Sequence, residues 1–367
     1  MSTNPPIRII SEKTILILNG NANKRHTQTR NQLWETFHRD SRIDVVVSES
    51  LENLERITDR ILREGHGVIF VGSGDGGTKA IYNQLIRKNP EGALHPGLTS
   101  PLLVPLPLGT GNAYAHLIGA DENPENAILD VLGFKDIPLL PPQSFPLIGI
   151  MSTDLEGRTT VEYGTFMGQG WDAMILNDYQ TTYKGQGLPG YLKAALGNSF
   201  GRVLLKGEST MVRVSSKCGE LYQIKKGNLE SGKIIVPEES RTDLLRGETV
   251  NTVIAGTTPT YGYNMKAFPL AEKAIKMGER GMMQLRVIIG NPRKTVAKMV
   301  AHAWGSFQGT YFPDWCKDYF AEQITVEAPE GLAFQNAGDA EGIKARVEYS
   351  ISPFKLAFVD LARLSKN

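Results

Sequence analysis

Residues Gly67 to Thr78 read GVIFVGSGDGGT, and this stretch decides the fold of the first half of the chain. It opens with the apolar, β-branched run GVIFV, which is typical of a strand buried in a parallel sheet. The strand breaks at once into a turn of glycines, one serine and one aspartate, and Lys79 to Ile86 then has the apolar spacing of a helix. The stretch therefore predicts a strand, a glycine-rich loop and a helix in succession.

The same succession recurs on both sides of this stretch. Lys13 to Asn19 and Ile43 to Val47 have the composition of buried strands, and helical spacing follows each of them, in Gln28 to His38 and in Leu51 to Arg63. Leu102 to Leu106 predicts a further strand, which ends in Leu-Gly-Thr-Gly-Asn before another helical stretch. Strands and helices that alternate in this way predict a doubly wound α/β domain whose ligand binds at the carboxyl ends of the strands.

The chain changes character near residue 142. Pro138 to Pro146 reads PLLPPQSFP, which is typical of a proline-rich connector. Beyond it the pattern favours strands, with helical segments at Gly190 to Leu205 and Pro292 to Trp304. The predicted strands are Thr159 to Met167, Thr210 to Ser215, Tyr222 to Ile224, Thr249 to Ala255, Met283 to Ile289 and Gln323 to Ala328. We therefore predict an α/β domain over residues 1–142 and a β-rich domain over residues 143–353; the pattern alone assigns Phe354 to Leu361 to neither.

Composition excludes several classes of protein. The formal net charge of the 367 residues is +1, which argues against a nucleic-acid binder that relies on long-range attraction to phosphates. Cys218 and Cys316 are far apart in the sequence and show no metal-ligand spacing. The start of the chain has no secretion signal, and no apolar run approaches ~18 residues. We expect a cytoplasmic protein that meets lipid, if at all, from the side of the bilayer.

The two glycine-rich loops are the candidate phosphate sites. Backbone N–H groups in a turn between a strand and a helix can converge on an anion, and glycines let phosphates approach closely. One such loop is equally consistent with a tight turn, but two in consecutive units favour a phosphate site, and neither contains a Walker lysine. The candidate nucleotide-binding residues are Gly72, Ser73, Gly74, Gly76, Gly77, Thr78, Gly109, Thr110, Gly111 and Asn112.

Four blocks of sequence resemble those of one kinase family. VGSGDGGTKAIYNQL (residues 71–85) resembles the GGDGT block, and PLPLGTGNAYAHLIG (105–119) the PLGTGND block, of the diacylglycerol and sphingosine kinase family, whose relatives include the NAD kinases. FMGQGWDAMILNDYQ (166–180), with GLPGYLKAAL after it, resembles the GFDA block and the segment that follows it. FQNAGDAEGI (334–343) resembles the block that normally reads DGE. The resemblance covers about residues 13 to 359.

The resemblance implies a nucleotide-binding α/β domain, a larger β-sandwich domain with a cleft between them, and a C-terminal strand, about residues 354–367, that returns to the first domain. It also implies ATP and Mg²⁺ as cofactors. Asn19 and Asn21 stand where the family's opening NPxSG block would lie, which adds them to the nucleotide-binding candidates. The chain departs from the family at Gly77 and Ala80, where the family has threonine and glutamate, and at Ala113, where it has aspartate.

Three carboxylates are candidates for the chemistry and a fourth for binding the acceptor, because phosphoryl transfer needs a metal-binding group and a group that takes the hydroxyl proton. Asp75, inside the first glycine loop, is a candidate catalytic residue and metal ligand, and its alternative is a turn residue that caps the next helix. On a strand, Asp339 and Glu341 would point the same way. The resemblance makes Asp339 a general base or metal ligand with Glu341 as its partner; two solvated loop carboxylates are the alternative. It places Asp172 at the polar head of the acceptor.

These observations favour an ATP-dependent lipid kinase that phosphorylates a hydroxyl of diacylglycerol, a sphingoid base or a ceramide-like lipid. A kinase of a small soluble hydroxyl acceptor and a catalytically impaired nucleotide- or lipid-binding protein are the alternatives. The expected partner is the lipid or other acceptor, with no nucleic acid, and a homodimer is left open. Lys193 and Arg202 would place the helical stretch Gly190 to Leu205 at a membrane interface, while a helix packed on the domain is the alternative.

Overall fold

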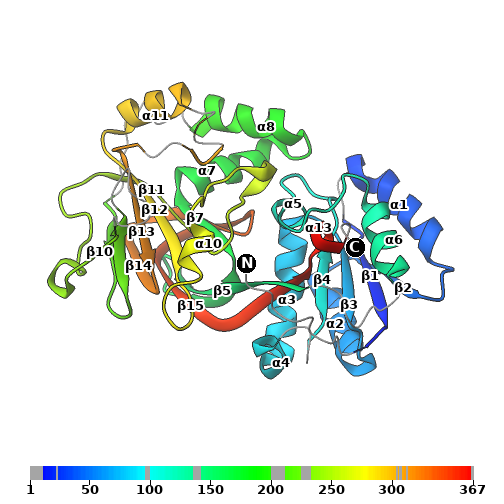
Figure 1. The fold of residues 1–367 in the computed structure, drawn as a ribbon. Coiled ribbons are helices and arrows are strands. Elements are labelled where there is room, and N and C mark those ends of the chain that lie inside the picture. Colours follow the sequence, from blue (N-terminus) through cyan, green and yellow to red (C-terminus); the bar gives the residue numbers. More distant parts are fainter. Residues whose placement is uncertain are drawn as a thin grey trace. The chain divides into compact units, whose positions relative to one another are not determined.

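The computed structural model describes residues 11–21, 24–95, 100–134, 142–199, 211–224, 233–302, 305, 308–310 and 313–364. The chain divides into two compact units (Figure 1). The first consists of Met1–Phe145, Gly262–Asn264 and Pro353–Asn367, and the second of Pro146–Tyr261 and Met265–Ser352. Gly262–Asn264 thus belongs to the first unit although the sequence around it belongs to the second.

The first unit is built on a parallel sheet. Its strands are ordered β2-β1-β3-β4, and β4 pairs in parallel with the C-terminal end of β15 through Leu103 and Phe358. Every residue of β3 and β4 is buried, which is why these strands read as continuous apolar runs rather than alternating ones. The bounds are β1 Thr14–Asn19, β2 Ile43–Ser48, β3 Val68–Gly72, β4 Leu102–Pro105 and β15 Asp339–Val359.

Helices alternate with these strands, so the predicted α/β class of the first half is confirmed (Figure 1). The best-defined helix is α2 (Leu51–Glu64), because the Ser50 side chain accepts the N–H of Asn53 at its start and Gly65, with a φ of 69°, ends it. The other helices are α1 Lys24–Phe37, α3 Asp75–Lys88, α4 Pro90–Leu94, α5 Ala113–Leu117, α6 Pro124–Gly133 and α13 Leu361–Leu364. The first glycine-rich loop joins β3 to α3 and the second joins β4 to α5, so both loops lie at the carboxyl ends of buried parallel strands.

The second unit is rich in antiparallel β structure, as the sequence predicts. Its strands follow the order β10-β9-β13-β12-β11-β7-β14-β15. In addition, β5 pairs with β15 and with β6, and β8 pairs with β14. One apolar cluster, which includes Met167, Val253, Leu285 and Val326, forms the core. The bounds are β5 Pro142–Thr153, β6 Thr159–Gly164, β7 Phe166–Gly170, β8 Arg213–Ser215, β9 Leu221–Ile224, β10 Lys233–Ile235, β11 Val250–Gly256, β12 Met283–Ile289, β13 Cys316–Ala321 and β14 Gln323–Asn336.

Helical segments connect some of the strands of this unit, and α7 packs against β7, β11 and β14. The segments are α7 Trp171–Asp178, the π-helical η2 Tyr179–Tyr183, α8 Gly187–Lys193, the π-helical η3 Ala194–Ser199, η4 Glu238–Ser240, α10 Ala271–Ala274 and α11 Pro292–Ala301. In the part of the chain that the structure describes, no helix is long and apolar enough to cross a membrane. The short turn η5 (Gly262–Asn264) lies in the first unit.

Two expectations about the second half need correction. Residues 142–146 of the expected connector are the start of β5, and prolines are tolerated there because edges and ends of strands do not need every N–H; residues 138–141 lie outside the described residues. The strand predicted to end at Ala328 continues to Asn336, because an irregularity between Glu327 and Leu332 carries β14 past Pro329. The predicted helix Gly190 to Leu205 is described only as far as residue 199.

Candidate functional site

The two glycine-rich loops touch each other at their glycines. A Cβ atom added to Gly74 would lie 2.9 Å from the Cα of Gly109, and one added to Gly109 would overlap the Cα of Gly74. Backbone therefore packs on backbone at this point, which no residue with a side chain allows without movement. Gly74 and Gly109 are required by this close approach, whatever else the loops bind.

Asp75 ties the first loop to the second. It is the first residue of α3, and its Oδ1 accepts the backbone N–H of Tyr114 at the start of α5, at 3.1 Å. Its Oδ2 lies on the side of Gly111, where an added Cβ atom would be 3.1 Å away. The carboxylate thus bonds to the start of α5, the helix after the second loop, whereas the turn-residue alternative has it cap its own helix α3.

The second loop is closed by its own asparagine. Asn112 has a φ of 50°, and its Oδ1 accepts the N–H of Gly109 at 2.8 Å. Asn tolerates this left-handed conformation because its short polar side chain bonds to nearby backbone. Thr110, at the tip, is exposed, and burial lowers the pKa of the nearby His116 imidazole.

A short segment distant in sequence completes this arrangement. The N–H of Tyr263 donates to the carbonyl oxygen of Gly111 at 2.8 Å, and a Cβ atom on Gly111 would lie 3.2 Å from the Cα of Gly262. Tyr263 and Asn264 have φ values of 60° and 58°, an uncommon conformation for residues with side chains. Sequence reasoning missed this segment, and its only signal is the turn-forming triplet Gly-Tyr-Asn.

Ser73 and Gly77 depart together from the family pattern. A Cβ atom on Gly77 would overlap the Oγ of Ser73, so the serine hydroxyl occupies the space that a threonine at position 77 would need. That hydroxyl donates to the carbonyl oxygen of Gly74 at 3.2 Å, and Ser73 is buried. The hydroxyl of Thr78 is also used locally, on the same carbonyl at 3.4 Å. The loop therefore has a hydroxyl near the place of the family's threonine at position 77, but Ser73 supplies it.

The remaining candidates of the first unit lie at the same edge of the sheet. Gly72 ends β3 beside Leu18 of β1, and Asn19 follows Leu18 directly. Asn19 accepts the N–H of Asn21 at 2.9 Å, and Asn21 donates to the carbonyl oxygen of Glu49 at 2.6 Å. Both asparagines thus shape the turn after β1. Gly76 is partly exposed in the first turn of α3, and Lys79, which the sequence analysis did not single out, is buried one turn further on.

Asp172 lies in the second unit, in a cluster of polar side chains. The hydroxyl of Tyr261 donates to its Oδ2 at 2.6 Å, and the amide of Gln335 donates to the same oxygen at 3.1 Å and to the Tyr261 hydroxyl. Burial raises the pKa of the Asp172 carboxyl to about 6, against the opposing effect of these hydrogen bonds. Burial and the neighbouring Asp172 raise the pKa of the Tyr261 hydroxyl well above its ordinary value.

Asp339 and Glu341 lie on a strand, at the start of β15, and both are partly exposed. The hairpin turn before them consists of Ala337 and Gly338, with φ values of 50° and 82°. Asp-Gly is a preferred pair for such a turn, so the Asp-Gly of a DGE block would fall on Ala337 and Gly338 rather than on residues 339 and 340. By position in the hairpin, Asp339 then takes the place of the glutamate.

Gln335 links this hairpin to the Asp172 cluster. Its Oε1 accepts the N–H of Gly338 at 3.0 Å, while its amide nitrogen donates to Asp172. Gln180, from η2, holds the other side of the turn by donating to the carbonyl oxygen of Gly338 at 3.1 Å. Neither Tyr261 nor Gln335 was predicted from the sequence. The predicted strand ended before Gln335, and no local pattern singles out Tyr261.

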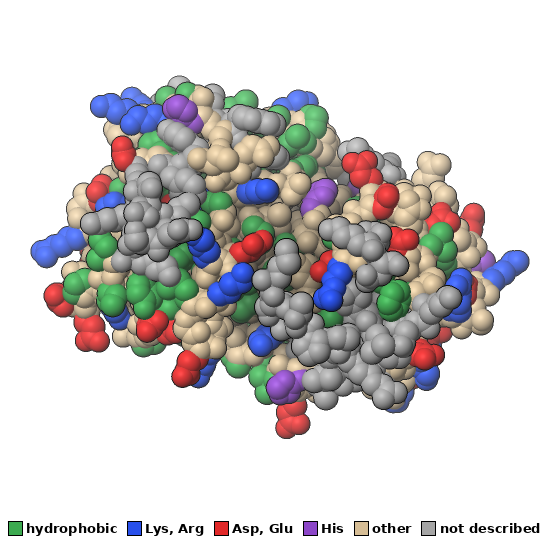
Figure 2. All heavy atoms as spheres, in the orientation of Figure 1, with side chains coloured by type: hydrophobic (Ala, Val, Ile, Leu, Met, Phe, Trp, Pro, Cys, Tyr) green, Lys and Arg blue, Asp and Glu red, His purple; other side chains and the backbone are tan. Residues whose placement is uncertain are grey.

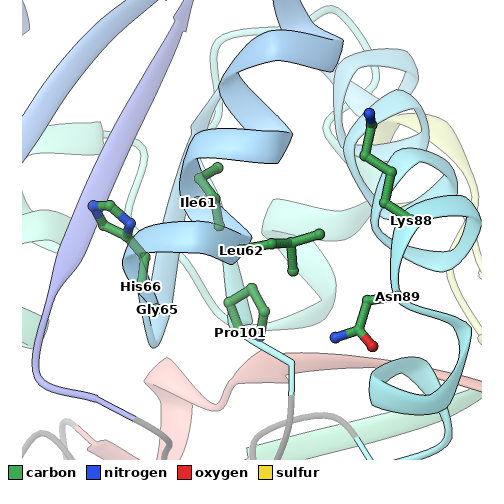
Figure 3. Close-up of a pocket in the computed structure, with 7 residues that line it drawn as sticks. All are labelled: Ile61, Leu62, Gly65, His66, Lys88, Asn89 and Pro101. Atoms are coloured by element: carbon green, nitrogen blue, oxygen red, sulfur yellow. The ribbon is translucent and has the colours of Figure 1, made fainter.

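Among the described residues, the group of side chains with metal-ligand proximity is Asp44, Glu64 and His66, whose ligand atoms lie within 4.8 Å of one another. The guanidinium of Arg60 already pairs with Asp44 at 3.0 Å and with Glu64 at 3.1 Å, so this group is an ion-pair cluster. His66 also borders a cavity of about 230 Å³ between α2 and Lys88 (Figure 3). Neither Asp75 nor Asp339 belongs to a group of three such side chains in the described part of the chain.

Comparison with known proteins shows which family the first unit is similar to. Residues 13–136 match the model of the diacylglycerol kinase catalytic domain, and this segment contains both glycine-rich loops. This match covers 124 of the 367 residues, so it describes what the first unit is similar to. The resemblance noted in the sequence is thereby confirmed, whereas no curated protein matches the chain significantly.

Solved structures show the same fold around this kinase-family domain. A diacylglycerol kinase from Bacillus anthracis aligns with a TM-score of 0.50 and 13% identity over 94% of this chain and 96% of its own. A proposed diacylglycerol kinase from the same organism aligns with a TM-score of 0.53 and 13% identity over 97% of each chain. At this identity the likeness concerns the fold, and it extends through the β-rich unit as well as the kinase-family domain.

Proposed function

We propose that this chain is a kinase that transfers the terminal phosphate of ATP to the hydroxyl group of a lipid. The observation that carries the proposal is the junction of two glycine-rich loops by Asp75, within a segment that matches the diacylglycerol kinase catalytic domain. Such loops present backbone N–H groups to phosphates, and the N-terminus of the 14-residue helix α3 adds its dipole to the first loop.

Asp75 is the carboxylate of this junction that would hold Mg²⁺. The fit is favourable because Mg²⁺ usually takes only one or two protein carboxylates and completes its shell with phosphate oxygens and water. One oxygen of Asp75 is committed to the N–H of Tyr114, and the other lies beside Gly111 in the second loop. Mg²⁺ would neutralise charge on the phosphates, and Asp339 is the further candidate ligand.

The second unit would receive the acceptor. Both donors that bind Asp172, from Tyr261 and Gln335, go to Oδ2, so within the described residues Oδ1 carries no hydrogen bond from another side chain. A carboxylate oxygen of this kind accepts a hydrogen bond from an acceptor hydroxyl. The acceptor is diacylglycerol, a sphingoid base or a ceramide-like lipid, and Asp339, with Glu341 beside it, is the candidate for taking its proton.

Transfer of labelled phosphate from γ-labelled ATP into a total lipid extract, with Mg²⁺ present, tests the proposal. We expect a labelled lipid with the unaltered chain and none with Asp75→Asn, which keeps an oxygen for the Tyr114 N–H but removes the charge. Asp339→Asn should abolish turnover with ATP affinity unchanged, because loss of a base acts on the transition state. If only water-soluble compounds become labelled, the acceptor is soluble and the lipid assignment is wrong.

A second candidate function is nucleotide or lipid binding without turnover. The hairpin turn favours it, because Ala337 occupies the position at which an Asp-Gly turn would carry its carboxylate, and Ala80 and Ala113 lack the family's carboxylates in the first unit. ATP binding with no labelled product in any extract would select this function. A labelled product that survives Asp339→Asn would instead exclude Asp339 as the base.

A further inference from the structure

The face of the second unit formed by α8, η3 and α11 combines exposed leucines with exposed basic residues. Leu188, Leu192 and Leu196 follow one another at intervals of four residues, with exposures of 43%, 50% and 56%. Residues four apart on a helix lie on the same side, so the three leucines form one apolar stripe. We call this stripe and the basic residues around it the leucine face.

The opposite side of the same helix holds it firmly on the unit. Ala194 and Ala195 are buried in an apolar cluster with Trp171 and Ile175 of α7 and Val296 of α11. The exposure of the leucines is therefore a property of a packed helix, since the packing against the unit uses small residues and leaves the large ones outside. Asp172 lies on the same helix, α7, directly after Trp171.

Basic side chains surround the stripe. Lys184 precedes the stripe along the chain, and Lys193 lies between its second and third leucines. The exposed Lys294 and Lys298 belong to α11, which packs against the same apolar cluster. Neither residues 184–199 nor residues 291–302 contain an aspartate or glutamate, although the whole chain has nearly as many acidic as basic residues. Figure 2 shows basic side chains over α11 and hydrophobic ones over α8, along one edge of this unit.

We propose that the leucine face docks on the surface of a bilayer that contains anionic lipids. A helix that is apolar on one side and basic around it lies in the headgroup region, with its apolar side among the acyl chains. Stable attachment of this kind takes two contributions, apolar insertion and attraction to anionic headgroups, and this face supplies both. The absence of acidic residues from these segments complements a surface of anionic headgroups.

The docking surface stands apart from the proposed kinase activity, but it would give that activity its substrate. A lipid acceptor is dilute in water and concentrated in the bilayer, so a kinase that docks there meets it at the surface. The two proposals also fail separately. Vesicle binding without phosphate transfer would leave the docking surface intact and remove the kinase.

Flotation of the full chain with lipid vesicles tests the docking surface. We expect binding to phosphatidylcholine vesicles that contain phosphatidylserine, and weaker binding to phosphatidylcholine alone or at high salt. Leu188→Gln/Leu192→Gln/Leu196→Gln should bind at least about tenfold more weakly, because three apolar side chains no longer insert. Lys184→Gln/Lys193→Gln/Lys294→Gln/Lys298→Gln should lose the preference for phosphatidylserine.

A matched variant controls for the general loss of exposed leucines. Leu51, Leu129 and Leu155 are 71%, 44% and 54% exposed and lie outside the face, so changing all three to Gln should leave vesicle binding unchanged. Equal loss in both triple variants, or no binding by the unaltered chain, would overturn the proposal. A third result would also overturn it: the unaltered chain is a dimer that does not bind vesicles, and the Leu188/Leu192/Leu196 variant is a monomer. The face would then join two copies of the chain.

Discussion

The two candidate sites, the glycine-rich loops of the first unit and the Asp172 cluster of the second, are built in opposite ways. The loops are made of backbone, and their shape depends on the absence of side chains at Gly74 and Gly109. The cluster is made of three side chains that bond to one another, Asp172, Tyr261 and Gln335. Backbone sites are therefore vulnerable to added atoms, and side-chain sites to changes of charge.

The largest effect should come from adding one carbon atom to the loop contact. Gly74→Ala places a Cβ atom against the backbone of Gly109, which cannot rotate away as a side chain would. We expect a loss of about 3 kcal/mol or more in the free energy of unfolding, at the upper end for overpacking, together with loss of ATP binding. Chemical denaturation and a binding titration measure both.

Gly133→Ala is the matched control, because nothing lies within 4 Å of an added Cβ atom at the end of α6. It should keep the ATP affinity of the unaltered chain and keep or raise its stability by up to about 1 kcal/mol. A Gly74→Ala variant as stable as this control would show that the two loops do not touch as described.

The cluster should respond to charge and pH rather than to size. The folded pKa of Asp172, about 6, lies above its ordinary value of 3.8, so between these pH values the folded state binds more protons than the unfolded state. Its contribution to stability is therefore full below about pH 4 and is lost as the pH rises to about 6. Asp172→Asn keeps an oxygen for Tyr261 and should stabilise the chain by up to about 2 kcal/mol at pH 7.

The pH dependence separates this explanation from a simple packing effect. The gain from Asp172→Asn should vanish below about pH 4, where Asp172 is protonated in both states, and denaturation at pH 3.5 and pH 7 measures the difference. A variant that is equally stabilised at both values would contradict the raised pKa. Loss of stability at pH 7 would show that the carboxylate is better satisfied than its burial implies.

Substitutions at Ser73 and Gly77 test whether the first loop has room for a side chain at only one of these two positions. Gly77→Thr alone should destabilise the chain, because the new side chain meets the Ser73 hydroxyl. Ser73→Gly/Gly77→Thr removes that conflict and restores the family pattern, so we expect a coupling energy of about 1–3 kcal/mol between the two positions. A double-mutant cycle with ATP binding and stability as readouts measures it, and additive effects would mean that the two side chains do not compete.

The contrast between the two regions also explains what the sequence could predict. The glycine-rich loops are contiguous motifs after buried strands, so their place at the sheet edge followed from residues 67–78 and 102–112 alone. The cluster joins Asp172 to Tyr261 and Gln335, which lie 89 and 163 positions later in the chain, and no local pattern relates them. Only the tertiary fold of the second unit brings these side chains together.

Local irregularities account for the other differences. Pro329 and Gly331 resemble the end of a strand, yet the irregular pairing of β14 with β15 carries the strand past them, which moved Gln335 out of the predicted loop. Gly262–Asn264 reads as an ordinary turn, and nothing in these three residues indicates that they pack on Gly111, about 150 positions earlier in the chain and in the same compact unit. The site was thus predictable where it is backbone and local, and not where it is assembled from distant residues.

The smallest effect is expected at the hairpin turn of Ala337 and Gly338, which is bound by the side chain of Gln335. Ala337 is buried and has a φ of 50°, a conformation that costs a residue with a Cβ atom about 1 kcal/mol or more, whereas glycine adopts it freely. Ala337→Gly should therefore raise the free energy of unfolding by up to about 1 kcal/mol, the relief of strain being partly offset by the greater freedom of glycine in the unfolded chain. Denaturation midpoints compared with those of Ala340→Gly, a position on β15 where glycine brings the same freedom to the unfolded chain but relieves no strain, measure the effect. If both variants lose stability equally, the turn is not strained, and the position of Ala337 no longer argues that the hairpin has given up a carboxylate.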